Sequence, residues 1–274
     1  MDCSAKRGIF ISLLLEEKVS AKQTDEVFIK ITKKEKKRIM SRLERTELFL
    51  GKEALEKLNN ARVAVIGLGG VGGAAAEAIL RAGVGHLLFI DGDSVDETNI
   101  NRQLLATYET VGMDKIEAAK LRFEKIAPET DVTYKKEFYL PENSSFLYDW
   151  KPDYIIDAID TVTAKLHIAK ECKNRGIKLL MCLGTGNRLD PEKLKIGDIS
   201  ETAGSCCGLS KVMRRELRKR GIEKQTVLFS TEEAKKCALD SENGRHAPGS
   251  ISFVPPAAGY LLASKCVRDL ISLP

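Results

Sequence analysis

The side chains best suited to chemistry in this 274-residue chain follow a glycine-rich segment, 66-IGLGGVGG-73. Acids, amides and cations come after it, namely Asp91, Asp93, Asn99, Asn101, Arg102, Gln103, Lys115 and, further along, Asp160. Glycine lets a backbone approach phosphate oxygens, whereas carboxylates bind ribose hydroxyls or divalent cations. Arginine and lysine neutralise phosphate charge. The set therefore suits a phosphate-rich ligand.

The glycine-rich segment predicts a nucleotide site without saying which nucleotide binds. Its glycines Gly67, Gly69, Gly70 and Gly72 lie between an apolar strand pattern, 62-RVAVIG-67, and a helical pattern over 71–83. That context gives the GxGxxG pattern its meaning. Asp91 ends the next predicted strand, at a spacing typical of an acid that binds a ribose. A nicotinamide dinucleotide, and a tight turn without a ligand, are the alternatives.

The additional charges favour a triphosphate that is cleaved. Arg102 and Lys115 suit its charge, which exceeds that of a dinucleotide pyrophosphate. Asp160, with Asp93 as a second possibility, suits Mg²⁺. This set makes sense if the α-phosphate is attacked and pyrophosphate leaves. Taken singly, Arg102 and Lys115 can be solvated surface cations, and Asp160 can be the cap of the next helix.

Alternating strand and helix patterns must position these side chains. We expect strands at 62–67, 86–91, 131–138, 154–160, 178–184, 193–199 and 226–231, and helices at 47–58, 71–83, 115–127, 143–149, 162–175 and 208–220. This alternation predicts a Rossmann-like, doubly wound α/β fold with a mostly parallel sheet. A nucleotide-binding core over about 60–186 would be followed by an α/β extension over about 187–274. A loop at 235–250, then a strand, a turn at Pro255-Pro256 and a helix would complete it.

The bulk composition is that of an ordinary globular protein, with 43% hydrophobic residues and a net charge of +5. No segment approaches the ~20 apolar residues of a membrane-spanning helix. The seven cysteines are scattered and form no CxxC pair, which favours a reducing cytoplasm and leaves a four-cysteine zinc site unsupported. We expect residues 1–39 to be a poorly ordered extension, with Met40 as an alternative start.

A basic segment suits an anionic polymer. Its cations, Lys211, Arg214, Arg215, Arg218, Lys219 and Arg220, lie on one predicted helix. Such a cluster supplies phosphate contacts to a nucleic acid, although a solvated helix face is the ordinary alternative. Cys206 and Cys207, just before the helix, and Cys237 in the predicted loop are either nucleophiles or small space-filling residues.

In combination these motifs resemble the adenylating superfamily of ubiquitin-activating enzymes and ThiF-like adenylyltransferases. The matching stretches are RVAVIGLGGVGG, the acids 91 and 93, 98-TNINRQ-103, 112-GMDK-115 and 157-DAID-160. The resemblance implies ATP and Mg²⁺, with Asp91 on the ribose, Arg102 and Lys115 on the phosphates and Asp160 on the metal, supported by Asn99 and Gln103. The stretch 42-RLERT-46 implies a homodimer in which Arg45 enters the neighbouring subunit's site.

Over residues 40–274 the chain resembles, more narrowly, the tRNA threonylcarbamoyladenosine dehydratase group. This likeness is carried by 42-RLERTEL-48, 139-YLPEN-143, 157-DAIDTVTAK-165, 184-GTGNRLDP-191, 211-KVMRRELRKRGI-222 and 249-GSISFVPPAAG-259. It implies ATP-dependent activation of a threonyl carboxylate beside a tRNA anticodon, then ring closure with net loss of water.

Two other functions remain open. One is the activation of the C-terminal diglycine of a sulfur-carrier or ubiquitin-like protein, and the other is NAD(P)-dependent oxidation. The lack of CxxC pairs and the basic segment weigh against the first. A sulfur-transfer partner protein is a further possibility.

Overall fold

The computed structural model describes residues 41–204, 207–235, 238–239 and 247–273. The chain divides into two units, one up to Leu48 and one from Phe49 onward. A short 3₁₀ helix, η1 (Ser41–Leu43), precedes α3 (Glu44–Leu50), which has no buried residue. One helix was expected over 47–58, but α3 ends before Gly51 and α4 (Lys52–Asn60) begins after it. Gly51 has φ +83°, a backbone conformation that glycine adopts easily and that ends the helix there.

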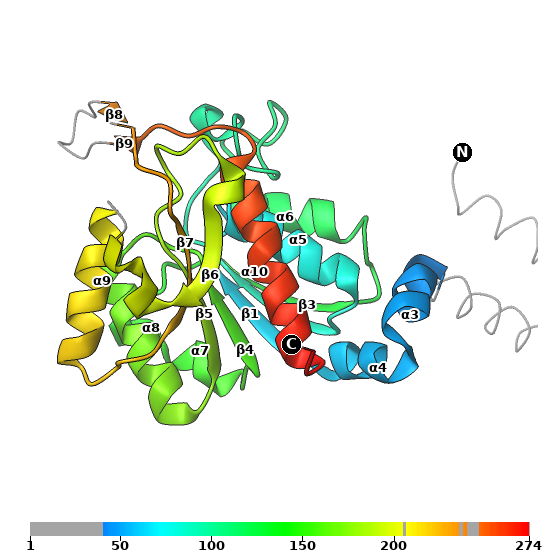
Figure 1. Cartoon of the computed structure of the whole chain (residues 1–274). Coiled ribbons are helices and arrows are strands. Elements are labelled where there is room, and N and C mark those ends of the chain that lie inside the picture. The colour runs from blue at the N-terminus through cyan, green and yellow to red at the C-terminus, as the bar shows by residue number, and fades with distance from the viewer. Residues whose placement is uncertain (1–40, 205–206, 236–237, 240–246, 274) are drawn as a thin grey trace, which may run out of the picture. The chain divides into compact units, whose positions relative to one another are not determined.

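Seven strands form one sheet in the order β3-β2-β1-β4-β5-β7-β6 (Figure 1). They are β1 (Arg62–Ile66), β2 (His86–Ile90), β3 (Asp131–Lys135), β4 (Tyr154–Asp157), β5 (Lys178–Cys182), β6 (Leu194–Asp198) and β7 (Thr226–Ser230). Every pair is parallel except β6 with β7. The predicted doubly wound, mostly parallel α/β fold is confirmed, and β6 and β7 extend the same sheet.

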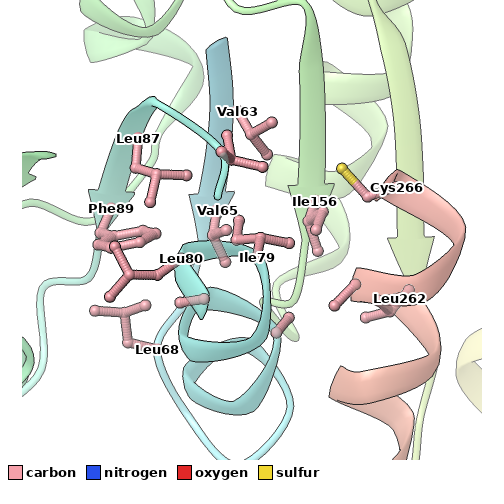
Figure 2. Close-up of a cluster of buried hydrophobic side chains, with 14 of the residues drawn as sticks. Val63, Val65, Leu68, Ile79, Leu80, Leu87, Phe89, Ile156, Leu262 and Cys266 are labelled. Carbon is pink, nitrogen blue, oxygen red and sulfur yellow. The ribbon is translucent and has the colours of Figure 1, made fainter. Parts of the chain in front are cut away.

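Helices cover both faces of the sheet. On one face lie α5 (Gly72–Ala82), α6 (Lys115–Phe123) and α10 (Val254–Leu270), and on the other lie α7 (Ser145–Asp149), α8 (Val162–Arg175) and α9 (Gly208–Lys219) (Figure 1). Strand β1 serves both faces, because Val63 and Val65 pack on the first and Ala64 and Ile66 on the second. Figure 2 shows the first of these two cores. Burial on both faces explains why the strands read as continuous apolar runs.

The C-terminal segment differs from the prediction in two ways. Residues 250–253 form no strand, and α10 begins at Val254 with both prolines in its first turn, where a missing N–H costs no helical hydrogen bond. A short antiparallel pair, β8 (Ala238–Leu239) with β9 (Ala247–Pro248), interrupts the expected loop. Helix α10 then packs on α5, so closely that a Cβ on Gly259 would lie 2.3 Å from the carbonyl oxygen of Val71. The end of the extension is thus part of the nucleotide-binding core.

The sheet order places a topological switch point beside the glycine-rich segment, the position at which such sheets form a ligand-binding crevice. After β1 the chain builds β2 and β3 on one side, then crosses to β4 on the other. At such a switch point ligands bind at the carboxyl ends of the strands. Here a Cβ on Gly67, after β1, would lie 3.0 Å from the carbonyl oxygen of Ala158, after β4. Among the described residues, no helix has the length and apolar character needed to cross a membrane.

Candidate active site

The glycine-rich loop runs from β1 into α5 and needs two of its glycines for steric reasons. Gly67 has φ +88°. A Cβ on Gly72 would lie 1.7 Å from the carbonyl oxygen of Gly67, so no other residue fits there. The loop therefore folds tightly against itself and directs the N-terminus of α5 toward the crevice. The N–H groups and partial positive charge of a helix N-terminus stabilise a bound phosphate.

Asp91 follows β2 and holds the glycine-rich loop. Its Oδ2 accepts a hydrogen bond from the backbone N–H of Leu68 at 2.6 Å, and its Oδ1 accepts one from the N–H of Asp93 at 2.8 Å. The side chain is buried, and this burial raises the pKa of Asp91 against the opposing charge of Lys115. A carboxylate has about four lone-pair sites, so two remain for hydroxyl groups of a ligand.

Lys115 is a buried cation, which excludes the ordinary alternative of a solvated lysine. Its Nζ lies 2.8 Å from Asp93 Oδ2, and its side chain is 7% exposed against 54% for that of Asp93. The backbone N–H of Lys115 also donates to the carbonyl oxygen of Asp93 at 3.0 Å. The pair compensates a charge that would be costly to bury alone. Asp93 is thereby engaged with a cation.

Asn99 belongs to the turn that presents Arg102. It ends the 3₁₀ helix η2 (Glu97–Asn99), where its Oδ1 accepts from the N–H of Asp96 at 3.2 Å. Its carbonyl oxygen accepts from the N–H groups of Arg102 and Gln103. Asn99 therefore shapes the turn.

Arg102 and Gln103 lie over the glycine-rich loop. Nη1 of Arg102 donates to the carbonyl oxygen of Thr98, and its Cγ lies 3.3 Å from the position of a Cβ on Gly70. Burial lowers the pKa of Arg102 from its ordinary value, but a guanidinium keeps its charge in proteins. Gln103 is buried, and its Oε1 has no hydrogen-bond partner among the described residues. The turn thus offers one cation and one unused acceptor to the loop.

Asp160 is exposed at the end of the segment that follows β4. Within the described part of the chain it makes no hydrogen bond or ion pair. The N-cap of α8 is Thr161, so Asp160 does not cap this helix as the ordinary alternative supposed. It lies two residues beyond Ala158, which contacts Gly67. The described residues hold no cluster of three or more metal-ligating side chains. A single carboxylate is a ligand that Mg²⁺ takes together with phosphate oxygens.

The comparison with known families agrees with this geometry. The ThiF family model matches residues 40–270. The chain belongs to the ThiF family. It is 42% identical to the tRNA threonylcarbamoyladenosine dehydratase of Bacillus subtilis over 245 residues, which cover 85% of this chain and 96% of that protein.

Further relatives of this ThiF-family chain include one solved structure and one more distant sequence. The crystal structure of E. coli tRNA N6-threonylcarbamoyladenosine dehydratase in complex with ATP matches with a TM-score of 0.77 and 29% identity, covering 85% of this chain and 95% of that one. An adenylyltransferase and sulfurtransferase of Vanderwaltozyma polyspora is 33% identical, covering 50% of this chain and 31% of that protein.

The first and last residues of 157-DAIDTVTAK-165, to which the sequence pattern assigned no role, form a buried ion pair in this ThiF-family chain. Nζ of Lys165 lies 3.0 Å from Asp157 Oδ2 and 2.7 Å from the carbonyl oxygen of Cys182, and both charged side chains are fully buried. Asp157 also accepts from the N–H of Ile159 at 3.2 Å. The pair joins β4, α8 and β5, and Asp160 lies between its two members in the sequence. The sequence contained a signal for this ion pair. An acid ends an apolar strand, and a lysine follows eight residues later among apolar helix positions.

An aromatic ring at the same edge of this ThiF fold was also missed. Phe138 is 59% exposed, and its ring atoms lie 2.7–2.8 Å from the position of a Cβ on Gly92. Gly92 stands between the two acids that follow β2, and only a residue without a side chain leaves room for this ring. An exposed ring beside an acid at this edge of the sheet offers a face on which a purine can stack.

The basic helix α9 is anchored by Met213 and Leu217, which are buried. Its cations fall into three groups. Arg214 Nη1 donates to the carbonyl oxygen and the hydroxyl of Thr202, both at 2.8 Å. Glu216 lies within 3.1 Å of Arg215, Lys219 and Arg220 side-chain nitrogens, and the hydrogen bonds from Arg220, Lys219 and Arg215 lower the pKa of Glu216 to about 2. Lys211 and Arg218 have exposed side chains without a partner among the described residues.

The cysteines of the described residues differ in burial. Cys172, Cys182 and Cys266 are free and buried, and burial raises the pKa of Cys172 and Cys182 to about 12. Cys207 is half-buried near Gly184. Cys206 and Cys237 lie outside the described residues.

Proposed function

We propose that this chain is an ATP-dependent tRNA threonylcarbamoyladenosine dehydratase. The observation that carries the proposal is the 42% identity to a dehydratase of that name over 96% of its length. The crevice supports it, because a glycine-rich loop, a ribose-type acid and two cations meet at the β1 and β4 switch point. A carboxyl group must be activated before it can close a ring, and ATP is the activating reagent that this set of residues suits.

The proposed reaction has two steps. First, an oxygen of the threonyl carboxylate attacks the α-phosphate of ATP, and pyrophosphate leaves. The carbamoyl nitrogen or oxygen then attacks the activated carbonyl carbon, and AMP leaves with the former carboxylate oxygen. Since the attacking group and the electrophile are on one nucleoside, ring closure gains a large effective molarity. The net change in the nucleoside is the loss of one water.

We assign the nucleotide contacts as follows. Asp91 binds the ribose, the glycine-rich loop (Gly67, Gly69, Gly70, Gly72) and the start of α5 hold the phosphates, and Phe138 offers a surface for the adenine. Arg102 and Lys115 neutralise charge on the phosphates, and Asp160 would hold Mg²⁺. Bound Mg²⁺ would neutralise further phosphate charge. In addition Gln103 Oε1 is available as an acceptor, since it lacks a partner among the described residues.

For the tRNA we assign the basic face of α9. Three cations share one acid at Glu216, which leaves a net positive charge there, and Lys211 and Arg218 add unpartnered cations. Phosphate contacts of this kind give affinity without reading the base sequence. Arg214 contributes less, because it already binds Thr202.

We also propose a homodimer in which Arg45 acts in the partner's site. Helix α3, which carries Arg45, has no buried residue, and Leu48 and Phe49 on it are 89% and 86% exposed. Adjacent exposed apolar side chains are typical of an interface. A tRNA substrate is in keeping with a cytoplasmic protein, and a sulfur-transfer partner stays a prediction.

Activation of a protein tail is the second candidate, supported by the similarity to an adenylyltransferase and sulfurtransferase. That similarity covers half of this chain, whereas the dehydratase similarity covers 85% of it. The dehydratase function is therefore favoured.

One experiment separates the two. The protein is incubated with Mg-ATP and tRNA that carries threonylcarbamoyladenosine, and the digested nucleosides are weighed. We expect an ATP-dependent loss of one water from that nucleoside and release of AMP. An unchanged nucleoside, with pyrophosphate exchange that requires a diglycine-tailed carrier protein, would instead establish the second candidate.

A further inference from the structure

Arg188 is a buried cation, two of whose nitrogens lack a hydrogen-bond partner in the part of the chain that the structure describes. It lies in the loop that follows β5, is 5% exposed, and has no hydrogen-bond partner for Nε or Nη1 within the described residues. A guanidinium carries five N–H donors, and burying unpartnered donors costs free energy. A buried, unsatisfied polar group of this kind calls for an explanation, and an unbound ligand is one.

The loop of Arg188 lies at the same edge of the sheet as the crevice. The N–H of Asn187 donates to the carbonyl oxygen of Gly249 at 2.7 Å. The next residue, Ser250, accepts from the side chain of Asn101 at 3.3 Å, beside Arg102. A few residues on, Pro255 lies against Gly70 of the glycine-rich loop. The segment 249–255 therefore connects the Arg188 loop with both parts of the nucleotide site.

Glu232 interacts with the charge of Arg188 but directs its hydrogen bonds to the loop backbone. Against the effect of burial, these hydrogen bonds and the charge of Arg188 lower the pKa of Glu232. Glu232 accepts from the backbone N–H groups of Leu189 at 3.0 Å and of Asp190 at 2.9 Å. It holds the loop through these hydrogen bonds and makes none with Nε or Nη1 of Arg188. The loop is thus held in place by its backbone, and the side chain of Arg188 is left for another anion.

Resting on the proposed function, we infer that Arg188 binds the threonyl carboxylate of the substrate nucleoside. The planar fork of a guanidinium matches a carboxylate through two parallel hydrogen bonds. Because the side chain is buried, it does not reach the backbone phosphates of a tRNA that contacts the exposed face of α9. Its loop is joined through 249–255 to the nucleotide site, where a nucleoside taken out of its stack would be inserted. Arg188 thereby distinguishes threonylcarbamoyladenosine from unmodified adenosine and orients the carboxylate toward the α-phosphate.

The test compares Arg188→Gln with the wild type on two tRNAs of the same sequence, one with and one without the modification. We expect the wild type to prefer the modified tRNA. The variant should lose about tenfold to a hundredfold of its affinity for the modified tRNA, the effect of a charge-assisted hydrogen bond. Its affinities for unmodified tRNA and for ATP should stay unchanged. Arg188→Lys keeps the charge without the fork and should lose less.

Thermal melting gives an independent readout. Since Nε and Nη1 have no hydrogen-bond partner within the described residues, Arg188→Gln should leave the melting temperature unchanged or raise it, whereas a structural arginine would lower it. Three results would overturn the inference: a retained preference for modified tRNA, a loss of ATP affinity instead, which assigns Arg188 to phosphate, or a lowered melting temperature in both variants. If the wild type itself dehydrates no tRNA, the proposed function fails; if wild type and Arg188→Gln dehydrate it equally, only this inference fails.

Discussion

The charged side chains of the crevice differ in how far the chain itself satisfies them. Lys115 is paired with Asp93, and Asp91 is held by two backbone N–H groups. Asp160 and Arg188, by contrast, have no such partner among the described residues. Groups of the first kind shape the site. Groups of the second kind are the ones from which ligand contacts are expected: Arg188 because a buried polar group is normally satisfied in a folded protein, and Asp160 because its exposed carboxylate is not engaged by the described chain.

Asp160→Ala should abolish ATP cleavage and leave the fold intact. Its carboxylate makes no hydrogen bond or ion pair within the described chain, so removal costs no stability, whereas loss of a metal ligand should lower turnover by at least about a hundredfold. Turnover is measured as AMP released with modified tRNA, and folding as the melting temperature. Glu142→Ala removes another exposed carboxylate and is the matched control. Near-normal turnover of Asp160→Ala would remove this residue from the metal role.

ATP affinity should depend on the protonation of Asp91. Burial raises the pKa of Asp91 above its ordinary value of 3.8, despite the opposing charge of Lys115. The carboxyl therefore takes up a proton at a pH where an exposed aspartate is still ionised, and ATP binding should weaken as the pH falls through that raised pKa. The free energy of unfolding should change with pH in the opposite direction. Because the pKa of Asp91 is raised in the folded state, protonation removes the cost of burying its charge, and this group destabilises the fold less as the pH falls.

Titration of ATP binding against pH, by calorimetry, checks this. Asp91→Asn should bind ATP more weakly and lose the acidic limb that the wild type shows. An identical acidic limb in Asp91→Asn would assign the effect to another group.

At the scale of elements, the Asp157–Lys165 pair fixes the position of the segment that carries Asp160. Lys165→Met leaves a buried carboxylate without its cation, so we expect a loss of about 3–5 kcal/mol in the free energy of unfolding. The double variant Asp157→Asn, Lys165→Met removes both charges and should recover part of that loss. Urea denaturation of the four proteins of this cycle measures the coupling. Additive effects of the two substitutions would contradict a mutual role.

The exposed cations of α9 should govern the salt dependence of tRNA binding. Replacing Lys211 and Arg218 with alanine removes two cations that have no partner in the described chain, so affinity should fall. The slope of log K against log salt should decrease by about 0.7–0.9 for each phosphate that the variant no longer neutralises. Lys120 and Lys125, exposed on and just after α6, provide a charge-matched control pair. A slope equal to that of the control pair would identify α9 as a solvated face.

Arg214, on the same helix, should affect stability instead. Arg214→Ala removes two hydrogen bonds to Thr202, so we expect a lower melting temperature than for the alanine variants of Lys211 and Arg218. An unchanged melting temperature would return Arg214 to the group of exposed cations.

For the whole molecule, the sequence was sufficient for the fold class and for the position of the glycine-rich loop between β1 and α5. Strand–helix alternation and the position of Gly67 between β1 and α5 are local signals, and the switch point follows from strand order. What was missed depends on tertiary contacts. Phe138 approaches Gly92 from the segment after β3, and Lys165 pairs with an acid on another element. Pro255 is a different case, because a proline in the first turn of a helix and a proline in a turn give the same local signal. Likewise, Arg214 appeared equivalent to its neighbours until Thr202 was seen beside it.

The proposed dimer predicts complementation between two inactive variants. Arg45→Ala and Asp160→Ala should each be inactive alone. If Arg45 acts in the partner's site, a mixed dimer contains one complete site, with Asp160 from one subunit and Arg45 from the other. Random mixing of equal amounts makes half of the dimers mixed, with one complete site of two in each, so activity should return to about a quarter of the wild-type value. AMP release is measured after unfolding and refolding the two variants together. No recovery, while mass spectrometry shows that mixed dimers have formed, would place Arg45 in its own subunit's site or outside the reaction.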